Sequence, residues 1–271
     1  MKNWTGERLE TFIFSRDSID HLHRYAIVSD YIKDKIVLDI ASGEGYGSNL
    51  MSEKASFVYG VDIDDYAVQE AKLKYKKENL EFITGNTSRI PIEDNSVDIV
   101  VSFETIEHHN EHDEMMAEIK RVLRPKGLLI ISTPDKLYYS DNRSFNNQFH
   151  VKELYKQEFT DLISRNFSKM QLLTQKYSNG NSIIQDETTH NELLIFSGNY
   201  EEITDVIINP LYLIAIASDG IFEDQKTTIF DGNQIVSDSF TNKINKIYES
   251  NSYRLGHLIL LPLKFFKKIF K

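Results

Sequence analysis

A glycine-rich stretch early in the chain has the residue types and spacing of a nucleoside-binding loop. In VLDIASGEGYG, Gly43, Gly45 and Gly47 come where an apolar run gives way to a helical pattern. Glycine allows a tight turn that a ligand can approach closely. Nineteen positions after Gly43, Asp62 ends a second apolar run, where a carboxylate can accept hydrogen bonds from both ribose hydroxyls. Loop and acid together predict a site for an adenosine moiety; the alternative is a tight turn that binds nothing.

The residues around the loop indicate which adenosine compound would bind. A dinucleotide fingerprint reads G-x-G-x-x-G, but Ser48 occupies its third glycine position, and the third glycine comes one residue early. Asp39 precedes the loop and Glu104 follows a later apolar run. Acids so close to the loop would repel a pyrophosphate. They favour a ligand with an ammonium and a sulfonium group, such as S-adenosylmethionine (SAM).

Histidines farther along the chain could accept the proton of a methyl acceptor. Methyl transfer from a sulfonium mainly requires that the acceptor be aligned in a dry site, and a sugar hydroxyl also benefits from a general base. In ETIEHHNEHDE, His108 is the first candidate base and Glu107 could orient it. In NNQFHVKEL, His150 is the second candidate. The alternatives are that His108 caps and packs the next helix, and that His150 is a cap or core residue.

The same histidine cluster raises the question of a metal. His108, His112 and Asp113 have a spacing that would allow metal ligation. Loop histidines beside acids are common, however, and methyl transfer from SAM rarely needs a metal. We therefore expect no metal site.

The apolar pattern predicts the framework that must position these residues. Five short apolar stretches read as buried strands, at residues 35–41, 56–63, 80–85, 97–103 and 127–133. Helical stretches separate them, at residues 45–55, 65–79 and 112–124. Apolar strands that alternate with helices predict an α/β fold, with a parallel sheet and helices on both faces. Beyond it we expect a helix at 151–166 and strands at 169–177 and 211–218.

Four stretches resemble successive motifs of class I SAM-dependent methyltransferases. They are VLDIASGEGYG, VYGVDIDDYAVQEAK, FITGNTSRIPIEDNSVDIVVSFETIEHH and EIKRVLRPKGLLIISTP. The resemblance covers roughly residues 25–220 and is to the branch that includes quinone-biosynthesis enzymes and many sugar and glycan methyltransferases. It implies a Rossmann-like sheet of seven strands, the last one antiparallel.

The resemblance also implies roles for residues in these motifs. Gly43 and Gly45 would pack under the methionine part of SAM. Asp62 would hold the ribose, and Ile63 would flank the adenine. Glu104 would lie beside the methionine moiety.

Asn86 departs from the family, which usually has an aspartate at this position. It could still pair with the amino edge of adenine, or it could be a turn residue. The family often has the pair Glu-His at His108 and the pattern Asn-x-x-His at His150. The remaining residues that we expect at the cofactor are Tyr25, Asp39, Ala41, Tyr46 and Thr87.

The N-terminal stretches TGERL and HLHRYAI resemble the opening of methyltransferases encoded with bacterial surface-polysaccharide genes. In such enzymes the helix that starts at His21, His23, Arg24 and Tyr25 forms a lid on the SAM pocket. This likeness favours a sugar acceptor. The alternative is a surface helix in which Tyr25 is an ordinary buried residue.

Composition excludes some classes of protein. The 271-residue chain is 41% hydrophobic and 27% charged, as in globular proteins, and it has no cysteine for disulfides or thiolate metal sites. It lacks the apolar core of a secretory signal and any run near the roughly 18 apolar residues of a membrane span, so we expect a cytoplasmic protein.

The net charge is unevenly distributed along the chain. Residues 243–271 carry a net charge of +6 and the first 242 residues carry −16. The acidic body should therefore repel nucleic acid.

The chain ends in LILLPLKFFKKIFK, which is both apolar and basic. A helix there would place apolar residues on one half of its surface, namely Leu263, Phe265, Phe266, Ile269 and Phe270. The opposite half would carry Lys264, Lys267, Lys268 and Lys271. This pattern predicts an interfacial helix on anionic head groups, separated by Pro262 from a second candidate segment, YRLGHLILL. The alternative is that the apolar face docks on the domain or on a partner subunit.

We therefore expect a methyltransferase domain with an N-terminal lid helix at residues 1–222 and an extension with a basic amphipathic helical tail at 223–271. The predicted acceptor is a sugar hydroxyl of a bacterial surface polysaccharide, or of its lipid-linked or nucleotide-sugar precursor. The protein would lie at the inner face of the cell membrane, as a homo-oligomer or within a glycan-assembly complex, and would bind no nucleic acid. The alternatives are a quinone or small-metabolite methyltransferase and a catalytically silent SAM-binding scaffold.

Overall fold

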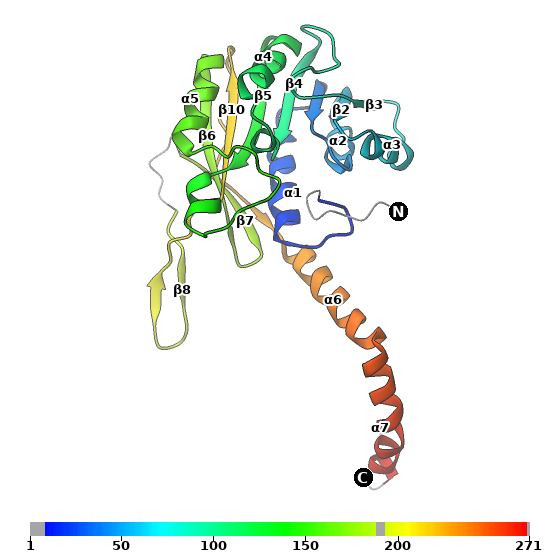
Figure 1. Cartoon of the computed structure of the whole chain (residues 1–271). Helices are drawn as coiled ribbons and strands as arrows, with labels where there is room; N and C mark the ends of the chain where they lie inside the picture. The colour runs from blue at the N-terminus through cyan, green and yellow to red at the C-terminus, as the bar shows by residue number, and fades with distance from the viewer. Residues whose placement is uncertain (1–8, 188–192, 270–271) are drawn as a thin grey trace.

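A computed structural model describes residues 9–187 and 193–269, with side chains up to residue 260. Within these residues one sheet contains nine strands, in the order β11-β7-β6-β10-β5-β4-β1-β2-β3 (Figure 1). The strands are β1 (Ile36–Ile40), β2 (Phe57–Asp62), β3 (Leu80–Thr84), β4 (Val97–Phe103), β5 (Leu123–Pro134), β6 (Lys169–Ser178), β7 (Asn181–Asp186), β10 (Tyr212–Ser218) and β11 (Thr228–Asp231). A separate hairpin pairs β8 (Phe196–Gly198) with β9 (Ile203–Asp205).

The parallel half of the sheet agrees with the sequence. Strands β1 to β5 pair in parallel, and β10 is antiparallel to both of its neighbours, β5 and β6. The expected count of seven strands is wrong, because β7 and β11 extend the sheet beyond β6. A two-residue turn makes the first addition possible: Asn179 and Gly180 have positive φ angles of 46° and 87°, which suit a tight hairpin.

Helices cover both faces of the sheet (Figure 1). α4 (His112–Val122) and α5 (Lys156–Asn166) pack on one face, and α1 (Arg16–Val28) and α2 (Tyr46–Met51) pack on the other. α3 (Asp65–Lys74) packs Val68 and Ala71 against Phe82 of β3. Apolar residues at helical spacing, such as Met115, Ile119 and Val122 on α4, are fully buried in the core.

α5 begins later than the expected residue 151, for a reason visible in the backbone. The amides of Val151 and Lys152 donate to the carbonyl of Glu107, and Leu154 forms a parallel bridge with Asp135. These bonds tie the segment before α5 to the ends of β4 and β5. The long connection from β5 to α5 is thereby held beside the carboxyl ends of the parallel strands.

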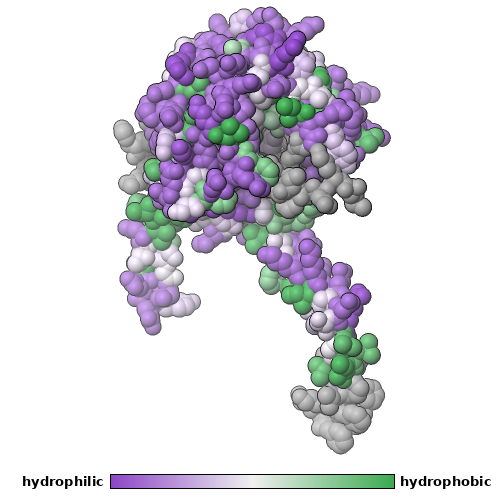
Figure 2. Space-filling model, in the orientation of Figure 1, coloured by the Kyte–Doolittle hydropathy of each residue, from purple (hydrophilic) through white to green (hydrophobic). Residues whose placement is uncertain are grey.

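Two helices at the C-terminus, α6 (Asn233–Glu249) and α7 (Asn251–Ile269), project from the sheet as an arm (Figure 1). The expected separation at Pro262 is not observed, because α7 continues through this residue. The sequence predicts apolar side chains on one half of this helix and lysines on the other, at residues 263–271. These side chains lie outside the described part of the chain. Leu255, Leu258, Ile259 and Leu260 are exposed on α7 and form the hydrophobic surface seen on the arm in Figure 2. Among the described helices, none is long and apolar enough to cross a membrane.

Candidate active site

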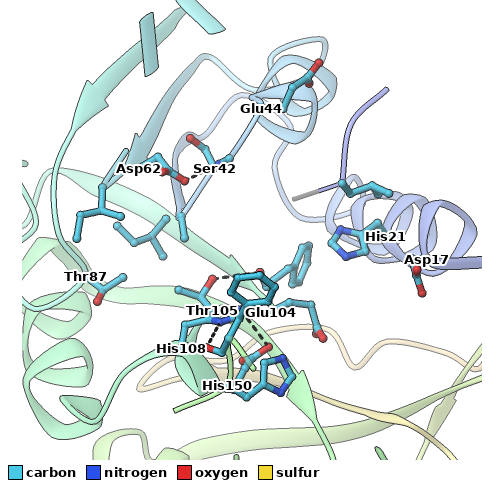
Figure 3. A pocket seen from close by; sticks show the side chains of 18 of the residues that line it. Asp17, His21, Ser42, Glu44, Asp62, Thr87, Glu104, Thr105, His108 and His150 are labelled. Carbon is cyan, nitrogen blue, oxygen red and sulfur yellow. Dashed lines mark hydrogen bonds and ion pairs between the residues drawn. The ribbon is translucent and has the colours of Figure 1, made fainter. Parts of the chain in front are cut away.

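A cavity of about 770 Å³ opens at the carboxyl ends of β1, β2 and β4. This is the edge where parallel α/β sheets bind ligands, and the volume lies within the range of ligand sites. Figure 3 shows Ser42 and Asp62 on one side of the cavity and His108 and His150 on the other. The fold thus brings the glycine loop and both candidate bases into one cavity.

The glycine loop is held open by left-handed backbone angles. Ala41 and Gly43 have φ angles of 61° and 57°, and both line the cavity. The Gly43 amide donates to Oδ2 of Asp62 over 2.8 Å. Gly45, with a φ of 89°, lies outside the cavity wall, since a Cβ there would contact the ring of Phe82 at 2.7 Å. Gly43 therefore lines the cavity, whereas Gly45 packs behind the loop.

Asp62 and Ile63 lie at the end of β2 as the sequence indicates. Asp62 is buried, and its Oδ1 accepts from the Asp64 amide over 2.9 Å, so its carboxylate is fixed by the backbone. Ile63 follows it in the cavity wall, and the residue is 69% exposed. The fixed carboxylate of Asp62 suits the hydroxyls of a ribose, and the exposed apolar side chain of Ile63 suits the face of its base.

Asp39 does not line the cavity. It is buried behind the loop, and Ser48 donates a hydrogen bond to its Oδ2 over 2.6 Å. Burial and the nearby charge of Asp62 raise the pKa of Asp39 to about 7, although the Ser48 bond opposes this shift. The structure thus places this expected ligand residue underneath the site.

The third glycine of the stretch, Gly47, has a packing role. A Cβ at this position would lie 2.0 Å from the ring of Tyr25. Its absence lets Tyr25 of α1 pack against α2, edge to face with Tyr46 and Phe103. Tyr25 and Tyr46 both line the cavity, so α1 closes one side of it.

Asn86 and Thr87 lie in a turn in the wall near Asp62. Oδ1 of Asn86 accepts from the amide of Ser88 over 3.0 Å and from its hydroxyl over 3.1 Å. The oxygen therefore stabilises the turn, and the amide nitrogen is the atom of Asn86 that can serve a ligand. The structure shows the role of Asn86 in the turn, and its pairing with adenine stays a prediction.

Glu104 follows β4 with a left-handed φ of 50°, an unusual angle that is enriched at functional sites. Ser132 donates to its carboxylate over 2.7 Å, and the Arg24 guanidinium lies 3.2 Å away. Arg24 itself is fully buried, donates to Gln175 over 2.7 Å and stacks on Tyr212. An arginine of α1 therefore holds this carboxylate in place.

His108 is oriented by a residue that the sequence did not indicate. Its Nδ1 lies 3.0 Å from the carbonyl of Phe149, so Nδ1 carries the proton and donates. Glu107, the expected orienting residue, has its Oε1 4.0 Å from Nε2 of His108, which is beyond hydrogen-bonding distance. Burial, with the charge of Glu104, raises the pKa of Glu107 well above its usual range.

His150 lies against His108 with 5.1 Å between ring centroids. Its Nδ1 donates to Glu153, and its Nε2 accepts from the side-chain amide of Asn147 over 2.9 Å. Both nitrogens of His150 are thus engaged, which favours a supporting role over that of base. His108 remains the stronger candidate base.

The grouping of His108, His112 and Asp113, which the spacing in the sequence allows, does not form among the described residues. His112 donates from Nε2 to the carbonyl of His109 over 2.8 Å, and the side chain of Asp113 is 79% exposed beside Arg165. The grouping that does form is Glu107, His108 and His150, whose ligand-type atoms lie within 4.8 Å of one another. Both nitrogens of His150 are already used in hydrogen bonds, to Glu153 and Asn147.

SAM fits the residues of the cavity on two grounds. The hydroxyl of Ser42 is buried in the wall without a hydrogen-bond partner in the described part of the chain, so a ligand would satisfy it. The described wall also has no lysine or arginine, and it includes Asp17, Glu44, Asp62, Glu104, Glu107 and Glu111. An acidic wall suits an ammonium and a sulfonium and disfavours a phosphate.

Comparisons with known proteins agree with this fit. Residues 38–131 match the family described as "Methyltransferase domain". A Mycolicibacterium smegmatis protein named "Probable S-adenosylmethionine-dependent methyltransferase" is 38% identical over 166 residues, which cover 59% of this chain and 62% of the relative. A phthiotriol/phenolphthiotriol dimycocerosates methyltransferase of Mycobacterium ulcerans is 29% identical over 119 residues, 43% of each chain. The chain thus spans about three fifths of the first relative's length.

A solved structure shows the same fold. The SAM-dependent methyltransferase from Mesorhizobium loti superposes with a TM-score of 0.52 at 14% identity, over 74% of this chain and 97% of the other. This likeness concerns the fold alone. Residues 38–131 thus match a methyltransferase domain in sequence, the described sheet has the fold of a solved SAM-dependent methyltransferase, and the residues of the cavity fit SAM as the cofactor.

Proposed function

We propose that this protein transfers a methyl group from SAM to a hydroxyl of an acceptor at a membrane surface, and that the acceptor is a sugar of a surface polysaccharide or of its precursor. The observation that carries the proposal is the division of the cavity. One side has the fixed carboxylate of Asp62, and the other has His108 among aromatic side chains, namely Tyr139, Phe145 and Phe149.

The residues of the cavity have distinct tasks in this proposal. When bound, SAM supplies a methyl group on a positively charged sulfur. Asp62 holds the ribose hydroxyls, Ile63 covers the adenine, and Ser42 donates to or accepts from the amino-acid end. The buried Arg24 holds the carboxylate of Glu104 in the cavity wall. Tyr25 and the start of α1 exclude water from one side.

His108 is the proposed base. The Phe149 carbonyl holds the proton on Nδ1, so the neutral ring presents an unprotonated Nε2. Nε2 would take the hydroxyl proton as the new oxygen–carbon bond forms and the bond from the methyl carbon to the sulfur breaks, with S-adenosylhomocysteine as the leaving group. His150 supports the ring of His108 and is itself held by Glu153 and Asn147.

The membrane part of the proposal rests on the arm. The arm leaves the body beside α1, because Gly232 at its base lies against Ile19, and the start of α1 lines the cavity (Figure 1). Exposed apolar residues on α7, namely Leu255, Leu258, Ile259 and Leu260, precede a sequence with four lysines among its last eight residues. Apolar residues with lysines suit an anionic lipid surface. The Mycobacterium ulcerans relative is named for a lipid acceptor, which agrees with an acceptor at a membrane.

The test is transfer of radiolabelled methyl groups from SAM to separated acceptors, using the full chain and His108→Gln. Lipid-linked glycans and nucleotide sugars represent the proposal, and quinone-type phenols and amines represent the small-metabolite alternative. Label in a glycan with wild type but not with His108→Gln supports the proposal. Label only in a quinone or an amine contradicts the sugar acceptor. Bound SAM without transfer to any acceptor would instead favour a silent scaffold.

A further inference from the structure

A second cavity, of about 560 Å³, adjoins the acceptor side of the active-site cavity. The two share Phe145 and His150 in their walls. The second cavity is formed by the connection between β5 and α5, including the π-helical turn Leu137–Asp141. π-Helical turns occur frequently at functional sites. A group attached to an acceptor at His108 would therefore have space beyond His150.

The two cavities differ in the charges of their walls. The described wall of the first has six carboxylic residues and neither lysine nor arginine. The second has Lys136 and Lys152, and Arg143 stacks over Phe145, the residue that both walls share, with 5.3 Å between its guanidinium and the ring centroid. Lysine and arginine side chains thus lie at the second cavity, next to His150, and not in the described wall of the first cavity, which suits a sulfonium.

The acids of the second cavity are already engaged. Glu153 accepts from the hydroxyl of Ser140 over 2.8 Å and from His150. Asp141 accepts from the hydroxyl of Tyr155 over 2.9 Å. Each carboxylate therefore has a hydroxyl or imidazole donor in place of a lysine.

The cations, in contrast, lack a carboxylate. Within the described residues, Lys136 contacts only the face of Tyr155, at 4.7 Å, and Arg143 contacts only aromatic faces. Lys152 forms no ion pair with any described acid. The backbone of both lysines is held in place, because the Lys136 amide donates to the carbonyl of Leu154 and the Lys152 amide donates to the carbonyl of Glu107. Two lysines that line the cavity without acidic partners, with Arg143 next to them on Phe145, are available to a ligand anion.

We propose that the second cavity binds a phosphate or diphosphate group of the methyl acceptor. This inference rests on the proposed function, since it gives the acceptor an anionic group next to the reacting hydroxyl. Lysine binds phosphate as a point charge, and Ser144 and Asn146 add neutral donors. The same chemistry is found in a lipid-linked sugar and in a nucleotide sugar, both of which join the sugar to a phosphate.

The experiment is calorimetric titration of the full chain with inorganic pyrophosphate, in the presence of S-adenosylhomocysteine. Lys152→Gln should weaken pyrophosphate binding about tenfold, the effect of losing one charged hydrogen bond. Asp141→Asn should strengthen it roughly threefold by removing a negative charge from the wall. Lys33→Gln is the matched control, because Lys33 is exposed and precedes the amino end of β1, at the opposite edge of the sheet.

Uridine diphosphate and farnesyl pyrophosphate distinguish the two sources. Tighter binding of farnesyl pyrophosphate than of pyrophosphate assigns the site to a lipid-linked acceptor, and tighter binding of uridine diphosphate assigns it to a nucleotide sugar. The inference is wrong if wild type binds none of the three, or if Lys33→Gln and Lys152→Gln weaken binding equally. Binding of S-adenosylhomocysteine in the same sample separates this failure from failure of the proposed function.

Discussion

Asp39 and Asp62 show how two carboxylates in neighbouring motifs come to do different work. Both follow apolar strand residues, and the sequence favours both as cofactor ligands. Asp62 reaches the cavity, whereas Asp39 points beneath the loop to Ser48. Strand periodicity predicts that a residue is near the strand end but not which neighbour its side chain will meet. That loop residues such as Gly43 and His108 line one cavity could be predicted, and the direction of the Asp39 side chain could not.

The position of Asp39 predicts a pH dependence of stability. Its pKa is raised to about 7 in the folded protein, against roughly 3.9 in an unfolded chain. Between these values the folded state holds one more proton, so the free energy of unfolding falls as the pH rises, by up to about 4 kcal/mol. Asp39→Asn should lack this contribution. Urea unfolding at pH 5 and pH 8 measures it, with the exposed Asp94→Asn as control, and an unchanged pH dependence in Asp39→Asn would refute the assignment.

His108 carries a second prediction at this scale. His108→Gln should lower kcat by about 10²–10⁴-fold, the usual contribution of a general base, and should leave SAM affinity unchanged. The methyl-transfer assay and calorimetry measure the two effects. His257→Gln, on the exposed arm, is the control and should keep full activity. A loss of SAM binding together with kcat would mean that His108 has a structural role.

At the scale of elements, the parallel half could be predicted because each strand is a short apolar run followed by a helix. The additions β7 and β11 could not, since neither forms an apolar run of that kind. The turn at Asn179–Gly180 was a local signal for β7. The hydrogen bond between His108 and the carbonyl of Phe149 could not be predicted from the sequence, because every residue has a backbone carbonyl.

The contact between α1 and α2 gives a prediction about Gly47. Gly47→Ala would drive a methyl group into Tyr25, and overpacking of this kind costs about 1–3 kcal/mol. The displaced Tyr25 should also weaken SAM binding. Adding Gly47→Ala to Tyr25→Ala should cost far less than adding it to wild type. Urea unfolding of the four proteins measures this coupling, and purely additive effects would show that the clash is not with Tyr25.

At the scale of the whole molecule, the distribution of charge and the projecting arm both favour contact with an anionic membrane through the C-terminal end. An acidic body carries −16 on its first 242 residues, and an arm projects from it toward a basic end with +6 (Figure 1). Such a body would be repelled by an anionic bilayer while its arm would be attracted. The sequence predicted the basic end from composition. The structure adds that the arm begins beside the wall of the active site.

The arm predicts binding to anionic vesicles. A chain that ends at Ser250 should bind vesicles rich in phosphatidylglycerol at least about tenfold more weakly than the full chain, since each lysine near the surface contributes about 1 kcal/mol. Neutral phosphatidylcholine vesicles are the control for charge, and SAM binding is the control for folding. Co-sedimentation measures the difference. Equal binding of the two chains would exclude the tail as the membrane contact.

The central claim is that the cavity beside Asp62 binds SAM, and calorimetry tests it most directly. SAM and S-adenosylhomocysteine are titrated into wild type, Asp62→Asn and the surface control Asp94→Asn. We predict binding by wild type and the control, and at least about tenfold weaker binding by Asp62→Asn, because the ribose loses a charged acceptor. Folded wild type that bound neither compound, or Asp62→Asn that bound both as wild type does, would contradict the account.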